Sequence, residues 1–219
     1  MKKTAIILGA TGLTGSILLE KLLKDQRYKT IKLFSRKHIE NLPSKVEQFI
    51  GDIVALENFK KEFIGDEVFC CIGTTAKKTP DKNKYRTIDY GIPVKAAELS
   101  KENGIHTFLV VSALGANAKS SIFYNRTKGE MEQAVLSKKI TNTYILQPSI
   151  IGGNREEKRI AEKIGLVIFK IIQPFFFGKL KKYKITEAEH IAQAMINLAN
   201  STSTEQIITS ASIKSLVKK

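Results

Sequence analysis

The sequence has little of what disulfide frameworks and most metal sites require, because its 219 residues include only two cysteines and three histidines. Cys70 and Cys71 are neighbours, and successive residues of a strand point to opposite faces, so we do not expect them to pair. Both are typical of small buried hydrophobic residues in a reducing compartment. Because His38, His106 and His190 lack metal-ligand spacing, no metal site is predicted.

Long hydrophobic runs are also missing, although 42% of the residues are hydrophobic and can bury a large core. The longest mostly apolar segment, 164–180, is interrupted by lysines, a glutamine and a proline, so no transmembrane helix is predicted. The first residues lack the apolar length and the cleavage site of a secretory signal. Since we also find no repeat or low-complexity segment, the sequence predicts a cytoplasmic protein with a single domain over 1–219.

Acidic side chains are the scarcer charge: 36 basic against 21 acidic residues give a formal net charge of +15. Such a surface can attract nucleic acid, an anionic membrane or a multiply charged cofactor. The lysines are scattered, and no recognised nucleic-acid motif accompanies them. We therefore expect a solvated basic surface and a small-molecule substrate, not nucleic acid, as the partner.

What the sequence does contain is a short apolar run followed by three evenly spaced glycines. Residues 5–8 are typical of a strand buried on both faces, and 16–23 have the apolar face of a helix. In a dinucleotide-binding turn, Gly9 would let the chain turn, Gly12 would leave room for a pyrophosphate, and Gly15 would let helix and strand pack closely. The spacing G-x-x-G-x-x-G departs from G-x-G-x-x-G, so by itself it also fits an ordinary strand–helix turn.

Further apolar runs alternate with amphipathic segments along most of the chain. This alternation predicts an α/β fold, a Rossmann-type doubly wound parallel sheet, with a small C-terminal lobe at 149–185 on the substrate side. Ligands of such sheets bind at the carboxyl ends of the strands. Thr186 and Glu189 have the spacing of a capping box and predict the start of a late helix. The predicted strands after the first are 30–34, 46–50, 67–72, 106–111, 142–146 and 206–208, and long helices are predicted at 85–103 and 122–137.

The residues about twenty positions after the last glycine indicate which cofactor the turn would bind. A carboxylate there would bind the ribose 2′-hydroxyl of NAD, but this sequence has Ser35, Arg36 and Lys37. A 2′-phosphate needs a cation and a planar donor, so the residues predict NADP(H). An ordinary surface role for Arg36 is the alternative.

Ser112, Tyr124 and Lys128 are the candidate catalytic residues. Tyr124 and Lys128 are four apart on a predicted helix and share a face, where the ammonium would lower the pKa of the phenol. Ser112 follows a predicted strand and could donate a hydrogen bond to a substrate carbonyl. The spacing Tyr-x-x-x-Lys arises easily by chance in a lysine-rich chain, and Tyr28 with Lys32 is a second match, across a loop and a strand start.

Five segments together resemble the atypical short-chain dehydrogenases/reductases, and most closely the branch around the Tat-interacting protein. They are 9–15, 51–53, 112–116, 124–130 and 147–149. The resemblance implies an extended-type Rossmann domain, NADP(H), and catalysis by the serine, tyrosine and lysine named above. Asp89 departs from the family, whose typical members have a catalytic asparagine there, and this leaves the proton-relay role of the position in doubt. The strand ends and the resemblance give these candidate cofactor-binding residues: Gly9, Thr11, Gly12, Leu13, Thr14, Gly15, Ser35, Arg36, Lys37, Asp52, Ile53, Gly73, Thr74, Thr75, Pro148, Ser149 and Ile150.

The expected function is that of an NADPH-dependent oxidoreductase acting on a small carbonyl or related substrate. The alternative is a binding protein that senses NADPH with little or no catalysis, because members of this branch include regulators of transcription or transport. Specificity is expected in 149–184, where 175–177 are three phenylalanines that could form a pocket wall, a dimer contact or plain core packing. A monomer or homodimer is expected.

Overall fold

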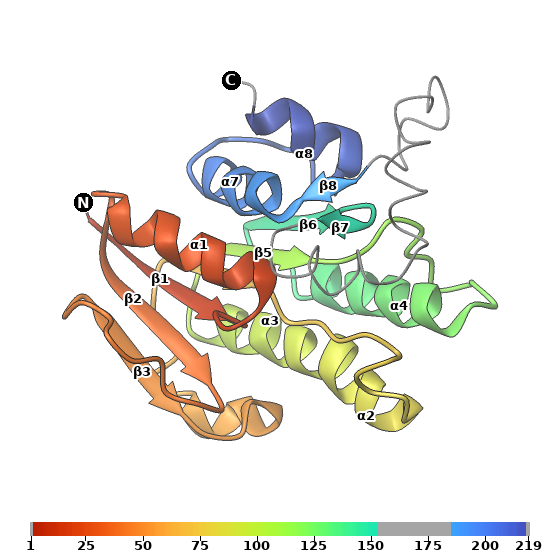
Figure 1. The fold of residues 1–219 in the computed structure, drawn as a ribbon, viewed down its shortest axis with the longest axis horizontal. Helices are drawn as coiled ribbons and strands as arrows, with labels where there is room; N and C mark the ends of the chain where they lie inside the picture. The colour runs from red at the N-terminus through yellow and green to blue at the C-terminus, as the bar shows by residue number, and fades with distance from the viewer. Residues whose placement is uncertain (1, 153–184, 218–219) are drawn as a thin grey trace.

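A single seven-stranded sheet forms the centre of the protein, whose computed structural model describes residues 2–152 and 185–217 (Figure 1). All its pairings are parallel, in the order β3-β2-β1-β4-β5-β6-β9. The predicted Rossmann-type fold is therefore confirmed. The strands are β1 (Lys3–Leu8), β2 (Tyr28–Ser35), β3 (Val46–Ile50), β4 (Glu67–Cys70), β5 (Thr107–Val111), β6 (Asn142–Gln147) and β9 (Ile207–Thr209).

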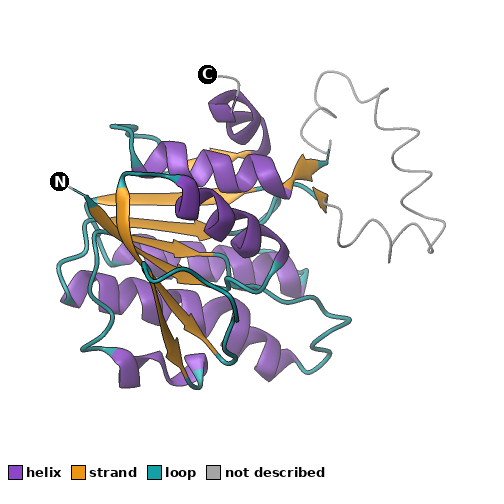
Figure 2. Cartoon of the chain, turned by 60° about the vertical axis from the view of Figure 1, so that its left-hand side comes forward, coloured by secondary structure: helices purple, strands orange, loops and turns teal. Residues whose placement is uncertain are grey.

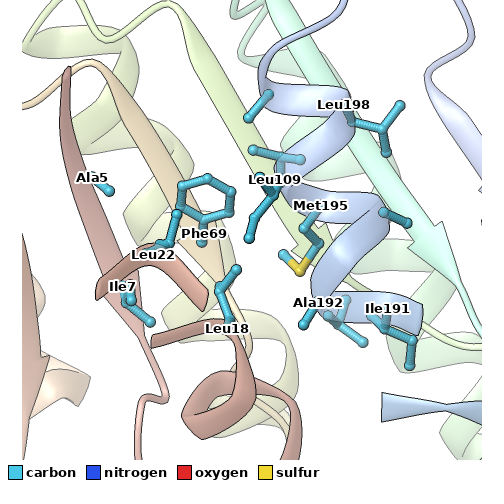
Figure 3. Packing of buried hydrophobic residues seen from close by; sticks show 14 of the residues in the cluster. Ala5, Ile7, Leu18, Leu22, Phe69, Leu109, Ile191, Ala192, Met195 and Leu198 are labelled. Carbon is cyan, nitrogen blue, oxygen red and sulfur yellow. The ribbon is translucent and has the colours of Figure 1, made fainter. Parts of the chain in front are cut away.

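Helices cover both faces of the sheet, which Figure 2 shows as three layers. Alternate residues of β1 enter different cores: Ala5 and Ile7 join one cluster, Ile6 and Leu8 the other. Figure 3 shows the first cluster, in which α1 and α7 pack against the sheet. The helices are α1 (Leu13–Lys24) and α7 (Ala188–Ala199) on that face, α3 (Ile92–Glu102) and α4 (Phe123–Ser137) on the other, and α8 (Ser210–Val217) beside α7 and β9.

The glycine turn brings α1 close to the end of β1. Gly9 has a φ of +87°, a left-handed conformation that a side chain would strain. A Cβ at Gly15 would lie 2.1 Å from the carbonyl oxygen of Gly9, so only glycine permits this close helix–strand contact. The packing role predicted for Gly15 and the turning role of Gly9 both follow from these contacts.

The helix predicted at 85–103 contains a wider turn. It comprises α2 (Lys82–Arg86), the π-helical turn η2 (Thr87–Gly91) and α3. Pro93 is the second residue of α3 and has no N–H to donate to the carbonyl four residues earlier, a usual cause of a local change in helix geometry. Asp89 lies within η2, and π turns often occur at functional sites.

Two other predictions need comment. The capping box is wrong: Thr186 is completely buried in β8 (Thr186–Glu187), and its hydroxyl lies 2.9 Å from Ser149 Oγ and 2.8 Å from Ser210 Oγ. Glu187 takes the N-cap position of α7 instead. Strand β8 pairs with β7 (Ile151–Gly152). Most of the predicted lobe at 149–185, including the three phenylalanines at 175–177, lies outside the described residues.

Candidate functional site

Two adjoining cavities lie along the carboxyl ends of the strands. One has a volume of about 380 Å³ and borders Ser112, Tyr124 and Lys128. The other has a volume of about 460 Å³ and borders Arg36 and Asp52. The residues common to both walls are Gly12, Cys71, Ile72, Gly73, Thr74 and Lys78. The cavities therefore adjoin along a groove that passes the start of α1, the place expected for a ligand in such a sheet.

The groove brings together most of the residues that the sequence singles out. All three candidate catalytic residues line it. So do most candidate cofactor-binding residues: Gly9, Thr11, Gly12, Leu13, Thr14, Arg36, Asp52, Ile53, Gly73, Thr74, Thr75, Pro148, Ser149 and Ile150. Gly15, Ser35 and Lys37 do not line either cavity. Gly15 packs against Gly9 instead, and the Ser35 hydroxyl donates to the Lys37 carbonyl at 2.7 Å, which shapes the turn that presents Arg36.

Helix α4 holds Tyr124 and Lys128 one turn apart on the wall of the first cavity. The loop after β5 packs tightly on this helix: a Cβ at Gly129 would lie 2.2 Å from the backbone nitrogen of Ala118. The ring of Tyr85 meets that of Tyr124 edge to face, with centroids 6.3 Å apart. Glycine and aromatic packing thus fix the phenol, which is 41% exposed and has no hydrogen bond within the described part of the chain.

Lys128 is almost fully buried and forms an ion pair with Asp89. Its Nζ lies 2.8 Å from Asp89 Oδ1, and both side chains are at most 4% exposed. The other carboxylate oxygen, Oδ2, accepts a hydrogen bond of 2.7 Å from the backbone N–H of Thr74. Asp89 therefore fixes both the lysine and the loop after β4, which lines both cavities.

Burial opposes the expected effect of Lys128 on the pKa of Tyr124. Burial raises the pKa of the Tyr124 phenol above its ordinary value, Lys128 lowers that pKa, and the Asp89 carboxylate raises it again. The net shift is upward because burial, the largest cause, outweighs the lowering by Lys128 that the sequence predicted. Asp89 makes a smaller contribution in the same upward direction.

Ser112 is buried and does not leave its hydroxyl proton free for a ligand. Its Oγ donates a very short hydrogen bond to Glu132 Oε1, and Gln147 Nε2 lies 3.0 Å from both oxygens of that carboxylate. Burial raises the pKa of Glu132, while the hydrogen bonds from Ser112 and Gln147 and the charge of Lys128 lower it. The predicted donation from Ser112 to a carbonyl conflicts with this arrangement.

The second cavity has the groups that a nucleotide requires. Helix α1 begins beside it with no acidic residue in the first turn, so its unpaired N–H groups and positive dipole end can face a phosphate. A Cβ at Gly12 would meet only the Gly9 carbonyl, at 3.3 Å. Arg36 is exposed on the wall, and Asp52 caps the turn η1 (Ile53–Phe59) by accepting from Val54 N at 2.9 Å. These residues fit a dinucleotide.

Comparison with known proteins places this site in a family. The model of a family described as NAD(P)H-binding matches residues 9–162, more than half of the chain. The chain belongs to this NAD(P)H-binding family.

Curated relatives of this NAD(P)H-binding protein agree with the resemblance found in the sequence. It is 31% identical to "Protein FMP52, mitochondrial" of Debaryomyces hansenii over 201 residues, 90% of this chain and 88% of that protein. It is 32% identical to "Protein HTATIP2" of Rattus norvegicus over 171 residues, 76% of this chain and 70% of that one. The identification as an atypical short-chain dehydrogenase/reductase of the Tat-interacting protein type is therefore confirmed.

Solved structures show the same fold at low identity. A UDP-glucose 4-epimerase of Thermotoga maritima superposes with a TM-score of 0.70 at 16% identity, covering 98% of this chain and 82% of that one. A UDP-N-acetylglucosamine 4-epimerase of Methanobrevibacter ruminantium gives 0.71 at 19% identity, covering 95% and 76%. At this identity the likeness establishes the fold alone.

Three residues in or beside the groove have contacts that the sequence did not indicate. Lys78 borders both cavities, but it lies in a loop without a recognised motif. Glu132 follows Lys128 by four residues, so the spacing of Tyr124, Lys128 and Glu132 along one helix face was a usable signal. Asp89 was singled out, yet its ion pair with Lys128 depends on contact between distant segments.

The described residues contain neither a membrane-spanning helix nor a metal site. No helix within 2–152 or 185–217 is long and apolar enough to cross a membrane. In the same residues no three histidine, cysteine or acidic side chains lie close enough to hold a metal ion. Both cysteines are free, and the Cys71 thiol lies 3.9 Å from the Met195 sulfur.

Proposed function

We propose that this NAD(P)H-binding protein is an NADPH-dependent oxidoreductase that acts on a small carbonyl or related compound through Tyr124, Lys128 and Ser112. The observation that carries the proposal is the position of the Tyr124 phenol. It lies on the wall of a cavity, has no hydrogen bond among the described residues, and shares that cavity with the start of α1. A polar group without a partner inside a ligand-sized cavity is available for chemistry.

The cofactor would extend along the groove across both cavities. The pyrophosphate would lie at the start of α1, where Gly12 leaves the backbone accessible. Arg36 would contact the 2′-phosphate, with Asp52 and Ile53 near the adenine. Gly73, Thr74 and Thr75 would line the middle of the groove. The remaining wall, at Pro148 to Ile150, would face the nicotinamide end.

When bound, the reduced nicotinamide supplies a hydride to the carbonyl carbon. Tyr124 donates its phenolic proton to the carbonyl oxygen, which becomes the hydroxyl of the product. The phenolate recovers a proton from water, since the ring is partly exposed. Lys128 stabilises the phenolate formed in that step and would hold the ribose of the cofactor, while Asp89 keeps the ammonium in place.

The cofactor preference gives the first test. We expect NADPH to bind more tightly than NADH, because Arg36 can make a charge-assisted contact worth roughly 1.5–3 kcal/mol to the 2′-phosphate. Arg36→Ala should therefore lower the affinity for NADPH by about 10- to 150-fold and leave that for NADH nearly unchanged. Lys29→Ala removes one positive charge near the opposite end of β2 and serves as the control. Titration of both cofactors measures the effect, and equal affinities in the unchanged protein would contradict the assignment.

A second function, sensing of NADPH with little catalysis, is supported by the ion pair of Lys128 with Asp89. Asp89 raises the pKa of the phenol and so works against the lowering by Lys128, while burial is the largest cause of the upward net shift. A screen of carbonyl compounds that follows NADPH absorbance separates the two functions. Tight NADPH binding without oxidation of the cofactor by any compound would favour the sensor.

The cellular setting is part of the same proposal. We place the protein in the cytoplasm as a monomer or homodimer, on the basis of its sequence; the fungal relative FMP52 is named mitochondrial. Fractionation of cells that express the tagged protein, together with analytical ultracentrifugation, tests both statements. Enrichment with mitochondria would overturn the first.

A further inference from the structure

The buried carboxylate of Glu132 lies behind the cavity that holds Tyr124. Glu132 is 8% exposed and sits on α4, one turn after Lys128. Its Oε1 accepts a hydrogen bond from the Ser112 hydroxyl, and the side-chain amide of Gln147 donates to the carboxylate. The contacts come from three elements, α4, the end of β5 and β6, so the arrangement is fixed by the sheet itself.

The contact with Glu132 decides what Ser112 can offer to a ligand. A hydroxyl has one proton and two acceptor lone pairs. Ser112 lines the cavity, but its hydroxyl proton is directed to Glu132, which does not line it. Only acceptor capacity is then left on the cavity side of Ser112 Oγ, so a carbonyl oxygen placed there would meet another acceptor.

We propose that Glu132 is a positioning residue that makes Ser112 a hydrogen-bond acceptor toward the cavity, and that the substrate therefore carries a hydroxyl group next to the reacting carbonyl. This inference rests on the proposed oxidoreductase function and names its substrate class, α-hydroxy carbonyl compounds. The reacting oxygen must accept the proton of Tyr124, so the donor for Ser112 has to be a second group. A hydroxyl on the neighbouring carbon is the nearest one available.

The charge state of Glu132 determines whether Ser112 Oγ faces the cavity as a hydrogen-bond acceptor or as a donor. Both of its neighbours in hydrogen-bond contact, Ser112 and Gln147, donate to it, which suits an ionised carboxylate. The charged and titratable groups nearby are Lys128 on α4 and, beyond it, Asp89 on η2 and Tyr124. A protonated Glu132 would have to donate to Ser112 Oγ, since Gln147 Nε2 is itself a donor. The serine proton would then turn toward the cavity.

Carbon-13 NMR of the whole protein, labelled at glutamate side-chain carboxyls, tests the charge state directly and without cofactor or substrate. Glu132→Gln assigns the signal by its loss. We expect the Glu132 resonance at the ionised position at neutral pH, and a higher midpoint of its titration in Ser112→Ala, because one donor to the carboxylate is lost. A protonated signal at neutral pH, or a midpoint unaffected by Ser112→Ala, would overturn the proposal.

The substrate class is tested with two ketones that differ by one hydroxyl, acetoin (3-hydroxy-2-butanone) and 2-butanone. We expect kcat/KM with NADPH to be about 10-fold higher for acetoin, the range of one neutral hydrogen bond. Glu132→Gln carries an amide that can donate to Ser112, so the preference should fall toward equality, with NADPH affinity retained. Ser112→Ala should do the same, and it is the second variant if Glu132→Gln does not fold.

Glu130→Gln is the control, because Glu130 lies on the same helix but pairs with Arg86 outside the cavity. It should keep the preference for acetoin. A preference for 2-butanone, or an unchanged preference in Glu132→Gln, would overturn the substrate class. If the protein binds NADPH and reduces neither ketone, the substrate class is overturned, the carbonyl screen decides the oxidoreductase proposal, and the NMR result decides whether Ser112 is an acceptor toward the cavity.

Discussion

Two polar clusters lie at opposite ends of the strands of the same sheet, here called the amino edge and the carboxyl edge, and they contain similar residue types. The amino-edge cluster consists of Lys3, Tyr28, Glu67 and Asn200. The carboxyl-edge cluster consists of Asp89, Tyr124, Lys128, Ser112 and Glu132. Each combines a lysine, a carboxylate and a tyrosine, so residue type alone does not explain why one is a candidate site and the other is not.

The clusters differ in whether the tyrosine hydroxyl has hydrogen-bond partners among the described residues. The Tyr28 hydroxyl donates to Glu67 at 2.6 Å and accepts from Asn200 at 3.0 Å, and Lys3 pairs with the same carboxylate. These contacts join the starts of β1, β2 and β4 to the end of α7. Tyr124, in contrast, faces a cavity and has no hydrogen bond in the described residues. Closed polar contacts indicate a structural role, and an open polar group in a cavity indicates a site.

The largest effect should come from removing the hydroxyl of the open cluster. Tyr124→Phe keeps the ring and its contact with Tyr85 but loses the proton donor. General acid catalysis contributes about 10²–10⁴-fold, so the turnover of any substrate found should fall by that factor. NADPH affinity and the thermal unfolding midpoint should change little. Steady-state rates, cofactor titration and calorimetry measure the three quantities, and full activity would show that Tyr124 is not the proton donor.

The same change in the closed cluster should have the opposite profile. Tyr28→Phe leaves Glu67 buried with one donor fewer, which should lower the free energy of unfolding by about 1–3 kcal/mol. Turnover and NADPH affinity should be unchanged, because Tyr28 lies at the far edge of the sheet. Urea unfolding and the same rate assay measure the two quantities. If stability is unaffected, the amino-edge cluster does not secure the fold as we infer.

Asp89→Asn removes the negative charge that pairs with Lys128 in the carboxyl-edge cluster. Asp89 raises the pKa of Tyr124 and Lys128 lowers it, so the variant should have a lower phenol pKa. Carbonyl reduction needs the protonated phenol and declines as pH rises through that pKa. The decline should therefore occur at a lower pH in the variant.

The pH dependence of kcat/KM for reduction measures this shift, with tyrosinate absorbance, corrected with Tyr124→Phe, as a second readout. Because Lys128 loses its buried partner, thermal unfolding is followed as well, and a lower midpoint is expected. A decline of activity at unchanged or higher pH would mean that the ion pair does not tune Tyr124.

The sequence predicted the sheet well because burial leaves a local signal. A strand covered on both faces is a continuous apolar run, and the bounds of such strands were predicted to within a few residues. Strand β3, at the edge of the sheet, is only partly buried, and its bounds were predicted as observed. Predictions that needed distant contacts were wrong. The Thr186 hydroxyl has the spacing of a cap, but its partners are 37 and 24 residues away, at Ser149 and Ser210.

The candidate site follows the same division. Parallel strands end at one edge, so listing the residues after each strand collected most of the groove. The sequence did not show which charged side chains pair within the groove or which hydroxyls donate hydrogen bonds there. Lys128 meets Asp89 from 39 positions away and Ser112 meets Glu132 from 20. The contact with Glu132 conflicts with the prediction of a free Ser112 proton for a carbonyl. Lys128 lowers the pKa of Tyr124 as predicted, but burial outweighs it and the net shift is upward.

The smallest effect is expected at Lys32, which completes the chance match with Tyr28. Its Nζ donates to the Glu62 carbonyl at 3.0 Å and lies 5.7 Å from the centre of the Phe49 ring, and neither contact involves the cavities. Lys32→Met keeps most of the aliphatic stem and loses these contacts at a partly exposed position. The free energy of unfolding should therefore fall by only about 0.5–1 kcal/mol. Turnover and NADPH affinity should match the unchanged protein, measured beside Tyr28→Phe. A loss of turnover in Lys32→Met would show that residues far from the cavities affect the reaction. The two clusters would then not divide into a structural one and a catalytic one.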